Sequence, residues 1–184
     1  VGIGSTRSDS WIVIQSASRT SSETRMLSTD RPTDDPIVVL ERRPDVEDGI
    51  DHWGELFVMH TNDDAVDIRL LAAPVGADLA RPGSWTELVA HLPGRRILGA
   101  DAFATHLVIH EWTHAQPRLR VLFRDLTERV IDLGGDPHDV EPAANPQWET
   151  NLLRFTVQSL TMPTTLYDED VATGGPDLVR GIYP

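Results

Sequence analysis

One segment of the sequence has residue types and spacing that could perform catalysis, His110-Glu111-Trp112-Thr113-His114. An H-E-x-x-H motif is the signature of zinc peptidases, in which two histidines bind one zinc ion and the glutamate acts as a base on the bound water. This chemistry needs a helix, because residues four apart on a helix share one face. In a strand, the α-carbons of His110 and His114 would be roughly 13 Å apart, too far to bind one tetrahedral ion together unless the chain turns between them.

The surrounding residues favour a strand at this motif. Ala102–Ala115 could form an amphipathic helix in isolation, but Leu107–Ile109 occupies a position that is a predicted strand in three other parts of the chain. Pro117 would also end a helix soon after the motif. The extended metzincin motif needs glycine where Pro117 stands and histidine where Arg120 stands. A zinc site at His110, Glu111 and His114 is therefore the less favoured interpretation, and we assign no metal ligand, cofactor or catalytic residue to this chain.

One supersecondary pattern occurs four times along the chain. Its apolar segments begin at Trp11, Leu56, Leu107 and Leu152, which gives spacings of 45, 51 and 45 residues. This period is typical of the four-stranded blades of a β-propeller. Each apolar segment is preceded by a predicted innermost strand and followed by a partner strand, a polar turn and a shorter outer strand. The sequence therefore predicts an all-β fold, a partial β-propeller of about four blades with four antiparallel strands each.

The repeat assigns the whole chain to a single partial propeller domain, with blades at approximately residues 1–41, 48–93, 97–134 and 138–182. The six additional residues of the middle spacing fall in Val75–Ser84, which we expect to be a surface loop. The predicted strands, in chain order, are Val1–Arg7, Trp11–Ile14, Thr24–Leu27, Pro36–Leu40, Gly49–Trp53, Leu56–Met59, Asp67–Leu71, Trp85–Leu92, Ile97–Ala104, Leu107–Ile109, Pro117–Val121, Arg129–Leu133, His138–Glu149, Leu152–Phe155, Thr165–Tyr167 and Asp177–Arg180.

Composition excludes several classes of function. The 184 residues include no cysteine, so disulfides, thiolate catalysis and cysteine metal sites are excluded. Twenty-nine acidic and 16 basic side chains give a net charge of −13, which argues against nucleic acid as a partner. That charge favours cationic ligands, or it is simply a solvated surface that keeps the protein soluble. No apolar stretch approaches the roughly 20 residues needed to cross a bilayer, and no signal peptide is recognisable, so we expect no membrane partner and a cytoplasmic location.

Several segments resemble, in order, the propeller of the prolyl oligopeptidase family of serine peptidases, and in particular its oligopeptidase B (protease II) branch. They are Thr20–Asn62, Trp85–Glu111, Pro117–Val121 and Leu153–Gly174. The resemblance implies a seven-bladed parent propeller that caps an α/β-hydrolase domain. It also implies a Ser-His-Asp triad that hydrolyses short peptides after Arg or Lys, with the propeller restricting access to the nucleophile.

The same resemblance implies that this chain is not catalytic by itself. The family's nucleophile lies in a Gly-x-Ser-x-Gly-Gly turn, and neither Ser5 nor Ser84 has the glycine two residues later. The triad would lie beyond Pro184, in a domain that follows the propeller. The chain begins at Val1, and Gly175–Pro184 is shorter than the family's passage to the hydrolase domain, so we expect a fragment, a split gene or a shortened relative.

An incomplete ring creates a physical difficulty that becomes a prediction. A propeller removes exposed surfaces by closing, whereas an arc leaves apolar faces uncovered on its first and last blades. We therefore expect the isolated chain to self-associate, to be poorly soluble or to pack against further blades. Two other functions stay open: a free-standing scaffold that recruits a protein at its blade edges, and the zinc peptidase, whose bound zinc would be lost in the His110→Ala variant.

Overall fold

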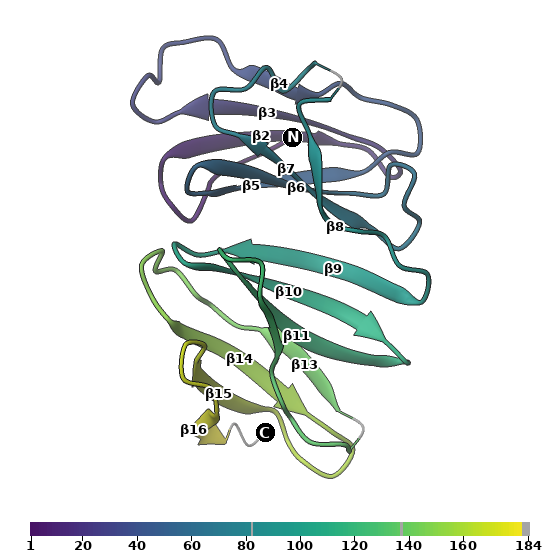
Figure 1. Ribbon diagram of the computed structural model, residues 1–184, viewed down its shortest axis with the longest axis vertical. Helices are drawn as coiled ribbons and strands as arrows, with labels where there is room; N and C mark the ends of the chain where they lie inside the picture. Colours follow the sequence, from purple (N-terminus) through teal and green to yellow (C-terminus); the bar gives the residue numbers. More distant parts are fainter. Residues whose placement is uncertain (82, 137, 182–184) are drawn as a thin grey trace. The chain divides into compact units, whose positions relative to one another are not determined.

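The computed structural model describes residues 1–81, 83–136 and 138–181, which form sixteen β-strands in four antiparallel sheets (Figure 1). Within each sheet the four strands are hydrogen-bonded in chain order, so every pairing joins consecutive strands. The described residues include no helix long and apolar enough to cross a membrane. The predicted all-β fold, a partial propeller of four four-stranded blades, is confirmed.

Each sheet begins with a strand that is paired on one side only. The first sheet contains β1 (Gly2–Ser5), β2 (Trp11–Ala17), β3 (Ser22–Ser28) and β4 (Ile37–Leu40). The second contains β5 (Asp48–Trp53), β6 (Leu56–Thr61), β7 (Arg69–Pro74) and β8 (Thr86–Val89). The third contains β9 (Arg95–Ala102), β10 (His106–Thr113), β11 (Gln116–Phe123) and β12 (Glu128–Val130). The fourth contains β13 (Asp139–Pro142), β14 (Leu152–Gln158), β15 (Thr165–Asp170) and β16 (Pro176–Gly181).

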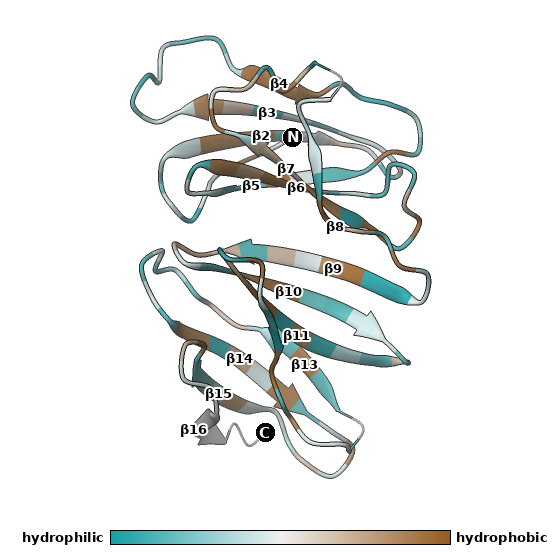
Figure 2. Cartoon of the chain, viewed as in Figure 1, coloured by the Kyte–Doolittle hydropathy of each residue, from teal (hydrophilic) through white to brown (hydrophobic). Residues whose placement is uncertain are grey.

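The strands form where β-branched and aromatic residues alternate between two faces. In β14, Leu153, Phe155 and Val157 are buried and point to one face, while Arg154 and Thr156 point to the other. Figure 2 shows this alternation as changes of colour along β9 and β14. β10 differs, because His106–Ile109 is buried on both faces, as expected for a strand in the middle of a covered sheet.

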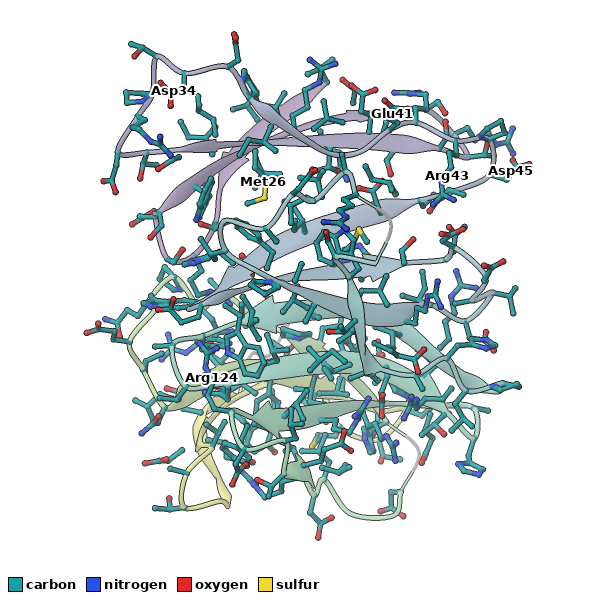
Figure 3. The ribbon with its side chains drawn as sticks, turned by 45° about the horizontal axis from the view of Figure 1, so that its top comes forward. Met26, Asp34, Glu41, Arg43, Asp45 and Arg124 are labelled. Carbon is teal, nitrogen blue, oxygen red and sulfur yellow. The ribbon has the colours of Figure 1, made fainter. Side chains whose placement is uncertain are left out.

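The chain divides into two compact units, Val1–Pro93 and Gly94–Pro184, each built from two sheets. In the first unit, side chains from the first and second sheets form one core, in which the ring of Trp11 packs edge-on against Phe57 with centroids 5.0 Å apart. Its buried members are Met26, Val39, Phe57, Met59, Ala73 and Leu79. In Figure 3, Met26 lies among the side chains of this core.

The second unit has a core of the same kind between the third and fourth sheets. Its buried members are Phe103, Val108, Leu119, Val121, Ile131, Val140, Leu153, Phe155, Val157 and Val171. In this unit β11 lies beside β13, so a third strand of one sheet approaches the first strand of the next. The first unit has the same arrangement, with β3 beside β5.

The predicted strands agree with the structure except in their lengths. β13 ends at Pro142, although we predicted a strand to Glu149. Proline has no backbone N–H to donate to the neighbouring strand. Beyond Pro142, the side chain of Asn145 makes the hydrogen bonds to the backbone of β14 that a longer strand would have made. Asn145 Oδ1 accepts a hydrogen bond from the Arg154 N–H at 2.7 Å, and its Nδ2 donates to the Arg154 carbonyl at 2.8 Å.

The loop Val75–Ser84 is more than a surface insertion. Leu79 within it is 4% exposed and belongs to the core of the first unit. Its carbonyl accepts a hydrogen bond from Trp85 Nε1 at 3.1 Å. The predicted end of the last blade, at Ile182, lies outside the described residues, and the assignment of all four blades to one domain stays a prediction.

Candidate functional site

The H-E-x-x-H motif lies in a strand and a tight turn. His110, Glu111, Trp112 and Thr113 are in β10, where His110 pairs with Leu119 of β11. His114 and Ala115 form the turn to β11 with φ values of 51° and 61°. The helix that the zinc interpretation requires is not formed, and the strand predicted at Leu107–Ile109 is confirmed.

Glu111 is an ion-pair partner and not a base for bound water. Its side chain is fully buried, Oε1 accepts from Arg118 Nε at 2.7 Å, and Oε2 accepts from Arg120 Nη2 at 2.8 Å. Burial alone would raise the pKa of Glu111, but the hydrogen bonds and charges of Arg120 and Arg118 outweigh it and hold this pKa below its usual value. Glu111 therefore stays ionised and engaged with two guanidinium groups.

His110 faces the opposite side of β10 from Glu111, because successive side chains of a strand alternate. Burial lowers the pKa of His110, and the charges of Glu141 and Asp139 oppose that shift only in part. Among residues 1–81, 83–136 and 138–181, no group of three or more histidine, aspartate or glutamate side chains is placed to hold a metal ion. The motif therefore does not assemble a zinc site in the described part of the chain.

The first strands of the sheets carry the other candidate functional residues. In a propeller the first strand of each blade lies nearest the central axis, so polar residues of this strand that are exposed to solvent can face the channel. These strands carry five carboxylates and two guanidinium groups: Asp48 and Asp51 on β5, Arg95, Arg96 and Asp101 on β9, and Asp139 and Glu141 on β13. The Nε of Arg95 is 3.9 Å from Glu111, so one of the two cations is already paired.

On β5, the polar residues are held by the first sheet. Asp48 is 3% exposed, and its Oδ1 accepts a hydrogen bond from Ser22 Oγ at 2.5 Å, while its own N–H donates to the same Oγ at 2.7 Å. His52 Nδ1 lies 2.7 Å from Ser8 Oγ, and the His52 ring lies beside both Phe57 and Trp11, with ring centroids 5.9 Å and 6.4 Å away. The roles of Ser8 and Ser22 could not be predicted from the sequence, because they depend on how the first two sheets pack against each other.

On β13, two carboxylates point to one face. Asp139 and Glu141 are two residues apart in the strand and line a cavity of about 90 Å³ together with Thr156, Gln158 and Thr164. Gln158 Nε2 donates to Asp139 Oδ2 at 3.3 Å. The cavity has room for a few water molecules and not for a peptide.

The family of the chain follows from this fold and from its sequence. A family model described as "Prolyl oligopeptidase, N-terminal beta-propeller domain" matches residues 1–180. The chain belongs to this family. The predicted resemblance to this family is confirmed, and proteins named protease 2 and oligopeptidase B are among those to which the chain is similar.

The relatives are much longer than this chain. Dipeptidyl aminopeptidase BI of Pseudoxanthomonas mexicana is 32% identical over 178 residues, which is 95% of this chain and 24% of the relative. Protease 2 of Moraxella lacunata is 26% identical over 172 residues, 94% of this chain and 24% of the relative. The chain thus spans about a quarter of the length of the curated relatives that it matches.

Two solved structures show the same fold at low sequence identity. Oligopeptidase B from Trypanosoma brucei, in a closed form with covalently bound antipain, matches with a TM-score of 0.89 and 22% identity over 99% of this chain and 27% of that one. Oligopeptidase B from Leishmania major matches with a TM-score of 0.88 and 18% identity over 98% of this chain and 27% of that one.

Proposed function

We propose that this chain is the propeller portion of an oligopeptidase B-like serine peptidase, that it gates the access of short peptides to a hydrolase domain, and that those peptides carry Arg or Lys. The observation that carries the proposal is the family match over residues 1–180, on four sheets that repeat with a blade's period. The chain by itself has no catalytic role in this proposal, because the triad belongs to the hydrolase domain.

The charge on the first strands supports a preference for basic peptides. In the second unit, Asp139 and Glu141 on β13 place two negative charges on the first strand of the fourth sheet, the strand that lies nearest the central axis of a propeller. The negative potential of these charges attracts cationic peptides and weakens as salt is added. The net charge of −13 acts in the same direction over longer distances.

The gene sequence is the first test. The reading frame beyond the codon for Pro184 should encode Gly-x-Ser-x-Gly-Gly followed by the aspartate and histidine of a triad. A stop codon at that point would reject the gating function.

The substrate preference has a separate test in the complete peptidase. Changing Asp139→Asn and Glu141→Gln together should lower kcat/KM for Arg substrates about threefold to tenfold at low salt and reduce its salt dependence. A neutral substrate should be unaffected. The matched control is Asp30→Asn with Asp34→Asn, which removes two charges from the turn after β3. Equal losses in both double variants would reject the channel charge as the cause.

A free-standing interaction scaffold is the second candidate function. It is favoured by one observation, the exposed apolar side chains of the first sheet, where Ile3 on β1 is 74% exposed. Apolar groups exposed together mark protein interaction sites. A stop codon after Pro184 combined with a stably folded product would make this function the leading one.

A further inference from the structure

One cation on the first strands has no partner of its own. Arg96 on β9 is exposed, and it makes no hydrogen bond or ion pair with any residue in the described part of the chain. Its neighbour Arg95 differs, because the Nε of Arg95 lies 3.9 Å from Glu111. The chain has 29 acidic and only 16 basic side chains, so a guanidinium without a carboxylate partner is available to a ligand.

An exposed tryptophan lies directly opposite Arg96 on the next strand. Arg96 pairs with Trp112 of β10, and Trp112 is 42% exposed. Directly opposite residues of an antiparallel pair point to the same face, with β-carbons about 4.5 to 5.5 Å apart. Pro117 of β11 pairs with Trp112 from the other side and is buried. The third sheet therefore presents a charged guanidinium and an apolar indole next to each other at its surface.

A β-bulge at Leu98 places open backbone on the same face of the sheet. The pairing of β9 with β10 shifts by one residue at Leu98, and Gly99 pairs with His110. His110 and Trp112 are two residues apart on β10 and point to one face. Their partners Gly99 and Arg96 therefore lie on that face too, although they are three apart on β9. A β-carbon built on Gly99 would meet nothing within 4 Å beyond its chain neighbours, so the surface over Gly99 is open.

Negative charge lies further along the same face. The ring of His110, opposite Gly99, lies in the field of three carboxylates, those of Glu141, Asp139 and Asp101. The strand β13, which carries two of them, belongs to the same compact unit as β9. Along β9, the positive charge of Arg96 is thus followed by open backbone and then by negative charge. A short basic peptide has the complementary order, read from its C-terminal carboxylate to its cationic side chain.

We propose that Arg96 binds the C-terminal carboxylate of a short basic peptide, whose last side chain packs on Trp112 and whose backbone lies over Gly99. A guanidinium donates two parallel hydrogen bonds to a carboxylate, which fixes the orientation of the peptide as well as binding it. Arg96 and Gly99 are at most about 10 Å apart, so a basic side chain one or two positions before the C-terminus reaches the carboxylates near His110. We call this surface, formed by Arg96, Gly99 and Trp112, the Arg96 subsite. The inference rests on the proposed function for its substrate and adds to it a requirement for a free C-terminus.

A carboxylate suits the Arg96 subsite better than a phosphate. A phosphate group carries about 1.5 to 2 negative charges at neutral pH. The carboxylates near His110 and the net charge of −13 therefore repel it more strongly than they repel one carboxylate. The indole of Trp112 also favours an apolar side chain beside the bound group. The ligand expected here is a peptide that ends in an apolar residue.

Nuclear magnetic resonance of the 184-residue chain tests the Arg96 subsite with the tripeptide Ala-Arg-Leu. Of the five tryptophan indole N–H signals, that of Trp112 should shift as the peptide is added. The Trp112→Phe variant identifies this signal by its loss. The dissociation constant should be on the order of millimolar, as expected for one ion pair and little apolar contact. The same peptide with an amidated C-terminus should bind at least about fivefold more weakly, and Arg96→Gln should remove this difference.

The matched control is Arg19→Gln, which removes an exposed guanidinium from the turn between β2 and β3 and should leave the ratio of acid to amide binding unchanged. Gly99→Val is the second variant, because it fills the open surface without changing a charge. It should weaken binding of the tripeptide at least about fivefold. Equal binding of acid and amide overturns the inference. So does an equal effect of Arg96→Gln and Arg19→Gln, or binding of inorganic phosphate as tight as that of the tripeptide.

The Arg96 subsite and the gating function can fail separately. The titration needs no hydrolase domain, so equal binding of acid and amide rejects the subsite and leaves the gating function standing. A stop codon after Pro184 rejects the gating function and leaves the titration as the test of the subsite. In the complete peptidase, kcat/KM for Ala-Arg-Leu should exceed that for its amide at least about fivefold, and this ratio should fall to about one in Arg96→Gln. An unchanged ratio in that variant also overturns the inference.

Discussion

In each unit one buried carboxylate joins the two sheets, but its partner differs between the units. Asp48 in the first unit receives a hydrogen bond from the neutral hydroxyl of Ser22, whereas Glu169 in the second receives one from the Arg129 guanidinium at 2.5 Å. Asp48 is 3% exposed and Glu169 is fully buried. The same sheet-to-sheet junction is therefore built with a cationic donor in the second unit and a neutral donor in the first, so the two units should respond differently to loss of the donor.

Arg129→Ala should produce the largest loss of stability, because it leaves the buried carboxylate of Glu169 without its cation. The expected cost is about 3 to 5 kcal/mol. Hydrogen exchange should rise in β14 and β15 and stay unchanged in β2 and β3. Arg31→Ala, at an exposed turn of the first unit, is the control and should cost almost nothing. A cost of less than about 1 kcal/mol for Arg129→Ala would remove the difference between the junctions.

Glu111→Gln should produce the next largest loss of stability, about 3 kcal/mol. The reason is that Arg120, which is 3% exposed, loses its charged partner on β10. The low pKa of Glu111 in the folded state stabilises the fold above the carboxylate's ordinary pKa, and this contribution disappears as the pH falls through the lowered value. Unfolding by denaturant from pH 7 to pH 2 measures both effects. The acid loss should be smaller in Glu111→Gln than in wild type; equal losses would show that other groups cause it.

Ser22→Ala should cost about 2 kcal/mol, less than the loss of Arg129, because a neutral donor to Asp48 is removed. The same hydroxyl accepts from the Asp48 N–H, so two hydrogen bonds disappear together. Ser18→Ala, in the turn between β2 and β3, is a suitable control. Exchange should increase in β3 and β5 alone. A cost equal to that of Arg129→Ala would show that the charge of the partner is unimportant.

Glycine substitutions in two tight turns should change the stability least, and both should increase it. Ile68 before β7 has φ 70°, and Ala115 before β11 has φ 61°, although side chains with a β-carbon disfavour this region. Ile68→Gly and Ala115→Gly should each stabilise the protein by about 1 kcal/mol, once in each unit. The midpoint of thermal unfolding measures this. Ala73→Gly, at a buried position of β7, should destabilise the protein instead, which separates relief of strain from a general effect of glycine.

Much of the fold was predictable because each repeat contains an apolar run such as Leu56–Met59, and the recurrence of these runs at a blade's period indicates a strand at each of them. The length of β13 could not be predicted, because after Pro142 the side chain of Asn145, rather than the backbone, forms the hydrogen bonds to β14. The role of Glu111 was also beyond the sequence alone. Its partners Arg118 and Arg120 depend on the register of β10 with β11, and a motif read in isolation assigns it to zinc chemistry. The family could be recognised because its segments follow one another in order across the chain.

The pairing of every strand with its immediate neighbour in the chain has a consequence for how the protein is made. A sheet needs no residue that lies further along the chain, so each sheet can form as soon as its fourth strand has left the ribosome. Synthesis at about 5 to 20 residues per second separates successive sheets by a few seconds, long compared with the microseconds in which a hairpin forms. Within each unit the second sheet to be made can meet a first sheet that has already formed, so we expect each unit to assemble in the direction in which it is translated.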